Sequence, residues 1–329
     1  MKAIVYTKYG SPNVLQLKEV DKPVPKDTEV LIKVHAVAAT KADCELRSFN
    51  FPVKWFWLPL RIVMGILKPK RQVLGGYFAG EVVLTGSGVS KFTKGDLVFG
   101  TTKLRMGAYG EYICLPDSYT IVPKPYNMSF EEAAAVPLGG LNALHFLRKA
   151  NIQDGEKVLI NGAGGSIGTF GVQIAKLMGA EVTAVDSAIK EEMLVGIGAD
   201  HFVNYREEDF TKNGQKYDVI FNMVAKCTYS GCISALAPQG RYLMANPRIS
   251  DMLKSVLTTK LTPKTVIFVF AGEKEKELVV LKEMIEEGKI KSVVDKIFPM
   301  DQAADAHRRV ETEQRLGTIV ITMKNSENT

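Results

Sequence analysis

A run of glycines between a strand-like and a helix-like segment constrains this chain more than any other feature. Residues 158–160 are Val, Leu and Ile, as expected for a strand buried on both faces of a parallel sheet. Glycines follow at positions 162, 164, 165 and 168, and apolar residues then recur at helical spacing. Because glycine has no Cβ, such a turn lets the backbone approach a pyrophosphate, to which the helix N-terminus presents free N–H groups. The stretch therefore predicts a dinucleotide-binding turn.

The glycine spacing departs from the regular dinucleotide fingerprint, so its context decides the interpretation. Gly162 and Gly164 fit the first two positions of G-x-G-x-x-G, but Ile167 stands at the third, and an alignment through Gly168 is one residue longer. A simple tight turn between a strand and a helix would explain the same pattern. However, an apolar strand ending in Asp186 follows, and further strand-like runs alternate with helical stretches. These runs cover residues 202–203, 218–223, 241–244 and 265–270. The alternation predicts a doubly wound parallel sheet.

Composition and charge exclude several other classes of protein. A chain of 329 residues, 46% hydrophobic and 24% charged, is long enough for two domains with separate cores. The formal net charge of +6 is spread along the chain, which argues against a nucleic-acid partner. The four cysteines form no Cys-x-x-Cys pair, which favours reduced thiols and a cytoplasmic location. Since a strand-like run begins at residue 3, we expect no secretory signal.

The strand-like runs divide the chain into two kinds of domain. Residues 1–122 are mostly β, and proline and glycine separate the short strands expected there. These strands cover residues 3–6, 15–20, 29–39, 78–85, 96–99 and 111–115. Ser129 is a good N-cap for a helix that leads toward the glycine turn. The C-terminal strand-like runs do not extend the α/β alternation. The sequence thus predicts a β domain made of residues 1–122 and 273–329, with a nucleotide-binding domain, residues 123–272, inserted between its two parts.

Residues 50–71 are densely apolar but are interrupted by Pro52, Pro59 and several basic side chains. The segment is too broken for a transmembrane helix, so we expect no stable membrane insertion. Three interpretations remain open for it. It can be a helical insertion packed on the β domain, an apolar wall or lid over a substrate cleft, or a contact with a membrane surface.

Five separated motifs occur in a characteristic order. They are Leu74-Gly-Gly-Tyr-Phe-Ala-Gly80, Lys94-Gly-Asp-Leu-Val98, Glu132-Ala-Ala-Ala-Val-Pro-Leu-Gly-Gly140, Asn161-Gly-Ala-Gly-Gly-Ser-Ile-Gly168 and Ile197-Gly-Ala-Asp200. Together they resemble the medium-chain dehydrogenase/reductase superfamily, and within it the zinc-free quinone oxidoreductase and enone reductase branch. The resemblance implies an α/β fold in which a doubly wound Rossmann sheet is inserted in a GroES-like, mostly-β catalytic domain. The active site would lie in the cleft between the two.

The resemblance also bears on the metal and the reaction. Where zinc-containing members have a Cys and a His ligand, this chain has Thr40 and Gly76, and no cysteine stands near residues 137–140. The cysteine-rich lobe for structural zinc is missing, and none of the four histidines is paired at ligand spacing. We therefore expect a zinc-independent, NAD(P)H-dependent transfer of hydride to a small-molecule quinone or α,β-unsaturated carbonyl, which spreads the incoming charge by conjugation. A zinc-free alcohol dehydrogenase and a non-catalytic NADPH-binding redox sensor are the alternatives.

The resemblance assigns the cofactor to residues at the ends of the Rossmann strands. The pyrophosphate would lie on Gly162, Gly164, Gly165, Ser166, Ile167 and Gly168, and the rest of the dinucleotide would be bordered by Asn222, Val224, Asn246, Phe268 and Phe270. Asp186 is placed to accept hydrogen bonds from the adenosine ribose, which favours NADH. Lys190 and Tyr205 instead match positions that hold the 2′-phosphate in NADPH-using relatives. We favour NADP(H) narrowly over NAD(H).

Fewer sequence features bear on the substrate-binding residues and on the oligomeric state. Tyr77 replaces an acidic residue of the zinc-containing members, and its phenol can donate to a carbonyl oxygen. Thr40 stands where relatives often have an Asn near the nicotinamide ribose. The candidates for an apolar wall are Trp55, Trp57, Met106 and Tyr109. The apolar run 263–270 comes late in the Rossmann order, so it can form an exposed sheet edge that pairs with a second subunit, and we expect a homodimer.

Overall fold

The glycine turn belongs to a parallel sheet, as its sequence context predicts. The structure, a computed structural model, describes residues 1–51, 57–268 and 271–324. Within these residues, six strands pair in the order β10-β9-β8-β11-β12-β13, and all their pairings are parallel. The strands are β8 (Lys157–Asn161), β9 (Glu181–Asp186), β10 (His201–Asn204), β11 (Tyr217–Asn222), β12 (Leu236–Met244) and β13 (Thr265–Ile267). This order confirms the doubly wound sheet, with its switch point between β8 and β11.

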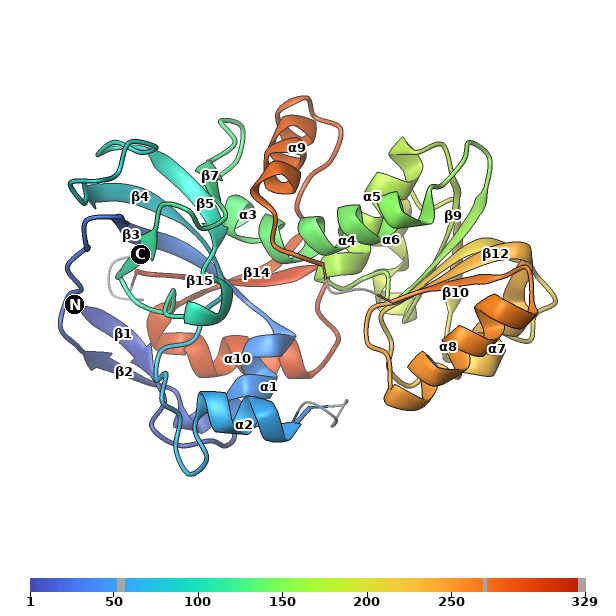
Figure 1. The fold of residues 1–329 in the computed structure, drawn as a ribbon, viewed down its shortest axis with the longest axis horizontal. Helices are drawn as coiled ribbons and strands as arrows, with labels where there is room; N and C mark the ends of the chain where they lie inside the picture. The colour runs from blue at the N-terminus through green and yellow to red at the C-terminus, as the bar shows by residue number, and fades with distance from the viewer. Residues whose placement is uncertain (52–56, 269–270, 325–329) are drawn as a thin grey trace.

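Helices cover both faces of this sheet, so its central strands are apolar throughout. They are α4 (Val136–Ala150), α5 (Ser166–Leu177), η3 (Ala188–Lys190), α6 (Glu191–Gly196), α7 (Tyr229–Ala235) and α8 (Ile249–Leu261). Figure 1 shows α5 and α6 on one face and α7 and α8 on the other. The buried side chains form separate clusters on the two faces, represented by Phe170 and Leu194 on one and by Tyr229 and Cys232 on the other. Val158 and Ile160 therefore meet apolar neighbours, as the run in the sequence predicts.

A second, mostly antiparallel sheet forms the β-rich lobe that holds both chain ends (Figure 1). Within the described residues its order is β14-β15-β3-β4-β5-β7, with β6 also paired to β3. Its strands are β3 (Glu29–Ala39), β4 (Tyr77–Thr85), β5 (Leu97–Thr101), β6 (Tyr112–Pro116), β7 (Ile121–Pro123), β14 (Val294–Pro299) and β15 (Thr318–Thr322). A separate pair consists of β1 (Lys2–Val5) and β2 (Gln16–Glu19). Because β15 pairs with β3, the C-terminal segment returns to the first sheet, as expected. The fold class is thus confirmed, while the domain boundaries at residues 122 and 272 stay predictions.

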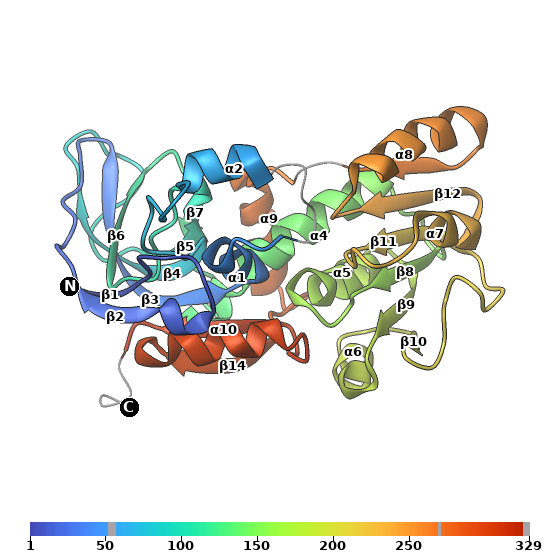
Figure 2. The same ribbon diagram turned by 90° about the horizontal axis from the view of Figure 1, so that it is seen from below.

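The helices of this lobe and of the junction include one that the capping pattern predicts. They are η1 (Pro12–Val14), α1 (Lys41–Ser48), α2 (Trp57–Met64), η2 (Lys103–Arg105), α3 (Phe130–Ala134), α9 (Glu275–Glu286), η4 (Met300–Gln302) and α10 (Ala303–Glu311). Ser129 caps α3 through a reciprocal hydrogen-bond pair with Glu132, which confirms the predicted helix start. Figure 2 shows α4 lying between the β-rich lobe and the parallel-sheet lobe.

The apolar segment 50–71 is helical in part and surface-exposed in part. Residues 57–64 form α2, in which Met64 is buried while Leu58, Ile62 and Val63 are exposed. Leu67, which follows the helix, is 92% exposed. The interpretation as a packed insertion therefore holds only for its buried positions. In the described part of the chain, we find no helix that combines the length and the apolar character needed to span a membrane.

Candidate cofactor and substrate site

The glycine turn has the shape that a dinucleotide requires. Gly162 follows β8 with a φ of 88°, in the left-handed region that other residues rarely adopt. A Cβ added to Gly168 would lie 2.4 Å from the carbonyl oxygen of Ala163, so a side chain at this position would push α5 away from the turn. The helix α5 begins at Ser166, and the N–H groups of its first turn have no partners within the helix. The turn therefore fits a pyrophosphate, which binds to such groups.

The two residues that favour competing cofactors form one buried ion pair beside this turn. Lys190 Nζ lies 2.9 Å from Asp186 Oδ1, and the two side chains are 6% and 9% exposed. The backbone N–H groups of Gly164 and Ser187 both donate to the Asp186 carboxylate at 2.8 Å. The Lys190 stem lies over the turn, since a Cβ on Gly164 would come within 2.2 Å of Lys190 Cδ. Asp186 thus already holds the turn in place, which the sequence does not reveal.

Tyr205 lies close to this pair through its backbone, while its side chain faces outward. Its N–H donates to the carbonyl oxygen of Asp186 at 3.1 Å. The residue is 54% exposed, and the Arg206 guanidinium lies 5.9 Å from its ring centroid. A phenol and a guanidinium at the end of β10 can both contact a phosphate group, although sequence reasoning selected only Tyr205.

Asn222 organises the switch point between β8 and β11. Its Oδ1 accepts hydrogen bonds from Asn161 Nδ2 at 2.9 Å and from the Val224 N–H at 3.0 Å. Its Nδ2 donates to the Tyr242 hydroxyl at 2.9 Å. Through these hydrogen bonds, the Asn222 amide positions the loop that follows β11. This loop lies close to the glycine turn, as a Cβ added to Gly162 would come within 3.2 Å of Val224 Cγ2. Asn246 Nδ2 fixes the same loop by donating to the Met223 carbonyl oxygen at 3.0 Å.

The C-terminal part of the chain also reaches the glycine turn. The Gly317 N–H donates to the Gly164 carbonyl oxygen at 2.9 Å, and Ser166 Oγ donates to the Gly317 carbonyl oxygen at 3.3 Å. Gly317 immediately precedes β15 of the β-rich lobe. Both lobes therefore shape the cofactor turn, and sequence reasoning missed this contribution because nothing in the local pattern connects positions so far apart.

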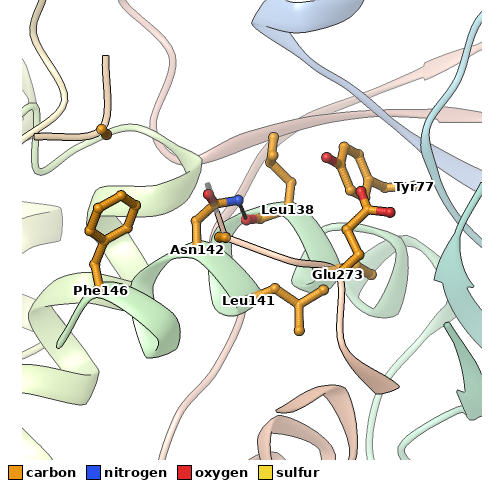
Figure 3. Close-up of a pocket in the computed structure, with 9 residues that line it drawn as sticks. Tyr77, Leu138, Leu141, Asn142, Phe146 and Glu273 are labelled. Carbon is orange, nitrogen blue, oxygen red and sulfur yellow. Dashed lines mark hydrogen bonds between the residues drawn. The ribbon is translucent and has the colours of Figure 1, made fainter. Parts of the chain in front are cut away.

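A cavity of about 240 Å³ lies where the two lobes meet. Its walls come from β4, α4, the end of β12 and the segment that returns to the β-rich lobe (Figure 3). The lining residues are Tyr77, Pro137, Leu138, Leu141, Asn142, Phe146, Ala245, Ala271 and Glu273. The predicted residue Tyr77 is thus brought to an inter-lobe cavity, together with Asn142 and Glu273, which sequence reasoning missed.

Tyr77 and Glu273 form the polar end of this cavity, as Figure 3 shows. Burial, together with the adjacent Glu273 carboxylate, raises the pKa of the Tyr77 hydroxyl well above its usual value. The Glu273 carboxylate, which lies beside this hydroxyl, accepts a hydrogen bond from Thr101 Oγ1 at 2.7 Å. Tyr77 consequently remains protonated at neutral pH and can donate a hydrogen bond to an oxygen in the cavity.

Comparisons with known proteins agree with this geometry. Residues 26–126 match the family described as alcohol dehydrogenase GroES-like domain, and residues 197–321 match the one described as zinc-binding dehydrogenase. The chain is 32% identical to 2-methylene-furan-3-one reductase of Solanum lycopersicum, over 98% of this chain and 79% of that protein. It is 31% identical to NADPH-dependent alkenal/one oxidoreductase, chloroplastic, of Arabidopsis thaliana, over the same shares of the two chains. The structure of the quinone oxidoreductase from Coxiella burnetii superimposes with a TM-score of 0.87 at 28% identity, covering 98% of this chain and 99% of the other.

The chain belongs to the medium-chain dehydrogenase/reductase superfamily. Its relatives place it in the quinone oxidoreductase and enone reductase branch, and it is an oxidoreductase. Among the described residues of this dehydrogenase/reductase, no three His, Cys, Asp or Glu side chains are grouped so that they could hold a metal ion.

Several residues predicted for the site have other roles in this dehydrogenase/reductase. Thr40 is 3% exposed and caps α1, since its hydroxyl donates to Asp43 Oδ2 at 2.6 Å and accepts from the Asp43 N–H. Tyr109 is fully buried, and its hydroxyl lies 2.9 Å from His307 Nε2, so it is a core residue and not part of an apolar wall. Phe268 follows the last residue of β13, Ile267, and packs against the cluster on the α7 face.

The remaining wall candidates are only partly placed by the structure. Met106 has a φ of 56°, and its sulfur would lie 3.9 Å from a Cβ added to Gly76, one residue before Tyr77. Trp57 is 39% exposed at the start of α2 and meets Phe49 edge to face. Trp55 and Phe270 lie outside the described residues. Met106 is therefore a wall candidate that the structure places beside Gly76, the residue that precedes Tyr77.

Proposed function

We propose that this enzyme transfers a hydride from a reduced nicotinamide to a quinone or an α,β-unsaturated carbonyl, without zinc. The observation that carries the proposal is the cavity between the lobes, where apolar walls surround the Tyr77 hydroxyl and Glu273. A conjugated acceptor needs apolar walls and one hydrogen-bond donor at its carbonyl oxygen, and the leucine side chains of α4 and the Tyr77 hydroxyl would supply these. The relatives that reduce alkenals, alkenones and quinones support the same substrate class.

The residues around the cavity have distinct tasks in this proposal. The nicotinamide, when bound, supplies the hydride, and the glycine turn with α5 would hold its pyrophosphate. The Tyr77 hydroxyl donates a hydrogen bond to the carbonyl oxygen as negative charge develops there, and the adjacent Glu273 carboxylate favours the protonated form of the phenol. Leu138 and Leu141 of α4 exclude water from the acceptor ring.

The test is oxidation of NADPH in the presence of a panel of quinones, enals and simple alcohols, together with metal analysis of the purified protein. We expect turnover with quinones or enals and no stoichiometric zinc. Alcohol oxidation without enone reduction would instead identify an alcohol dehydrogenase. Tight NADPH binding with no turnover on any compound would identify a redox sensor.

We propose NADP(H) as the cofactor in preference to NAD(H). The Asp186 carboxylate is occupied by Lys190 and by two backbone N–H groups, which reduces its capacity to accept the two ribose hydroxyls that distinguish NADH binding. Tyr205 and Arg206, neighbours at the end of β10, supply a phenol and a guanidinium that would contact a 2′-phosphate, which supports this preference. The Arabidopsis relative that is named as NADPH-dependent supports this preference.

We propose a cytoplasmic homodimer that pairs through the sheet edge. β13 is the terminal strand of the parallel sheet, and the neighbouring α8 leaves Leu253, Leu257 and Leu261 exposed. An apolar edge of this kind favours pairing with a second copy. Sedimentation at micromolar concentration tests this, and a monomer would refute it. The free thiols support the cytoplasmic location, and the return of β15 to β3 supports the domain boundaries at residues 122 and 272.

A further inference from the structure

Two cysteines that the proposed reaction does not use lie in contact at the start of α7. The sulfur atoms of Cys227 and Cys232 are 3.0 Å apart, and both residues are free thiols. Cys227 precedes the cap residue Thr228, and Cys232 is the fourth residue of the helix. Side chains at these two positions meet across the first turn of a helix, where apolar residues usually form a staple. Local helix geometry therefore brings the two thiols together.

The thiols differ in how solvent reaches them. Cys227 is partly exposed, whereas Cys232 is fully buried. Hydrogen bonds from Cys227 and from Tyr242 lower the pKa of the Cys232 thiol, whereas the hydrogen bond to Cys232 and burial raise the pKa of the Cys227 thiol, so the negative charge of the pair rests first on Cys232. A proton that moves across the contact to Cys232 leaves the thiolate on Cys227, the sulfur that a small oxidant can reach.

We propose that Cys227 and Cys232 form an oxidation site, at which a peroxide converts the dithiol into an intramolecular disulfide that constrains the cofactor loop. The Cys227 thiolate attacks one peroxide oxygen, the O–O bond breaks, and an alcohol or water leaves, so that Cys227 becomes a sulfenic acid. The Cys232 sulfur then attacks the Cys227 sulfur and expels water. Overall, the dithiol loses two electrons and two protons, and the peroxide accepts them.

The disulfide would act on the cofactor site through the loop after β11. Because a disulfide bond is about 2.05 Å long, the two sulfurs must approach from their present 3.0 Å. The Cys227 N–H donates to the Val224 carbonyl oxygen at 3.1 Å, and Val224 lies against Gly162 of the glycine turn. Movement of Cys227 toward α7 is thus transmitted to the residue that borders the cofactor.

The first experiment treats the intact protein with hydrogen peroxide and measures thiols and mass. We expect the thiol titre of the unfolded protein to fall from four to two, with one linked peptide pair containing Cys227 and Cys232, and dithiothreitol to restore it. In Cys232→Ser, a dione reagent should trap a sulfenic acid on Cys227. In Cys227→Ser, the buried Cys232 should stay reduced. Unchanged thiols in the wild-type protein, or a disulfide between subunits, would overturn the proposal.

The second experiment compares NADPH binding to the reduced and oxidised protein. We expect oxidation to weaken binding by about fivefold or more, and we expect the same peroxide treatment to leave Cys227→Ser unaffected. Equal affinity of both forms would overturn the link to the cofactor loop. This part rests on the proposed cofactor, whereas the thiol and mass measurements do not, so the two failures can be told apart.

Discussion

The ion pair between Lys190 and Asp186 yields the most demanding prediction about this site. Replacement of Lys190 by Met keeps much of the stem that lies over Gly164 but removes the ammonium group. The Asp186 carboxylate, 9% exposed, is then left without its cation, although Gly164 and Ser187 still donate to it. Breaking a buried pair from one side typically costs about 3–5 kcal/mol. Because two donors remain, we expect the lower end, about 3 kcal/mol.

The assay is thermal unfolding of the cofactor-free protein, with a double-mutant cycle as the control. A loss of about 3 kcal/mol corresponds to a fall in Tm of roughly 6–12 °C for a domain of this size. Asp186→Asn should lower Tm as well, but the double variant should lose less than the sum of the two single losses, since neither charge is then left alone. Additive losses, or a Lys190→Met variant as stable as the wild type, would refute the argument that the pair supports the turn.

The same variants test the cofactor. If Lys190 contacts the 2′-phosphate when NADPH binds, Lys190→Met removes a charge-assisted interaction of about 1.5–3 kcal/mol, which is roughly a tenfold to hundredfold loss of affinity. NADH affinity should barely change. Asp186→Ser should weaken NADH and strengthen NADPH. Should Lys190→Met leave NADPH binding intact while Asp186→Ser abolishes NADH binding, the enzyme uses NADH.

Three further predictions address the cavity, the turn and the core. Tyr77→Phe should lower kcat about 100-fold with an unchanged Tm, and an unchanged kcat would remove Tyr77 from the mechanism. Gly168→Ala places a Cβ 2.4 Å from a backbone oxygen of the glycine turn and should abolish nucleotide binding in a titration, whereas Gly196→Ala, with nothing within 4 Å, should bind normally. Burial lowers the pKa of His307 to about 3, so the unfolded chain takes up a proton there before the native protein does, and stability should fall as pH decreases from about 6.5 toward 3. His307→Gln should flatten this slope in urea unfolding at a series of pH values, and an equal slope in both proteins would contradict it.

Local patterns predicted the elements of this fold, because apolar strands, caps and glycine turns are each defined within a few residues. The parallel sheet, the edge position of β13 and the cap at Ser129 were all predicted in this way. Contacts between side chains far apart in the chain were not predicted. The local sequence around Tyr109 is equally compatible with a cavity wall and with a core position. Only the folded chain shows that its hydroxyl contacts His307. Glu273 likewise has no local signal, since only the folded chain brings it to Tyr77.

The glycine turn shows why such distant contacts matter for the cofactor. Its backbone is held from three directions: Gly164 donates to Asp186, Gly164 accepts from Gly317, and Val224 packs on Gly162. Asp186 and Val224 belong to the parallel-sheet lobe, but Gly317 precedes a strand of the other lobe. A ligand on the turn therefore binds to a backbone that is held in part by the β-rich lobe. A nucleotide that binds the turn better in this arrangement stabilises it by mass action, and in this arrangement Tyr77 and α4 both line the cavity.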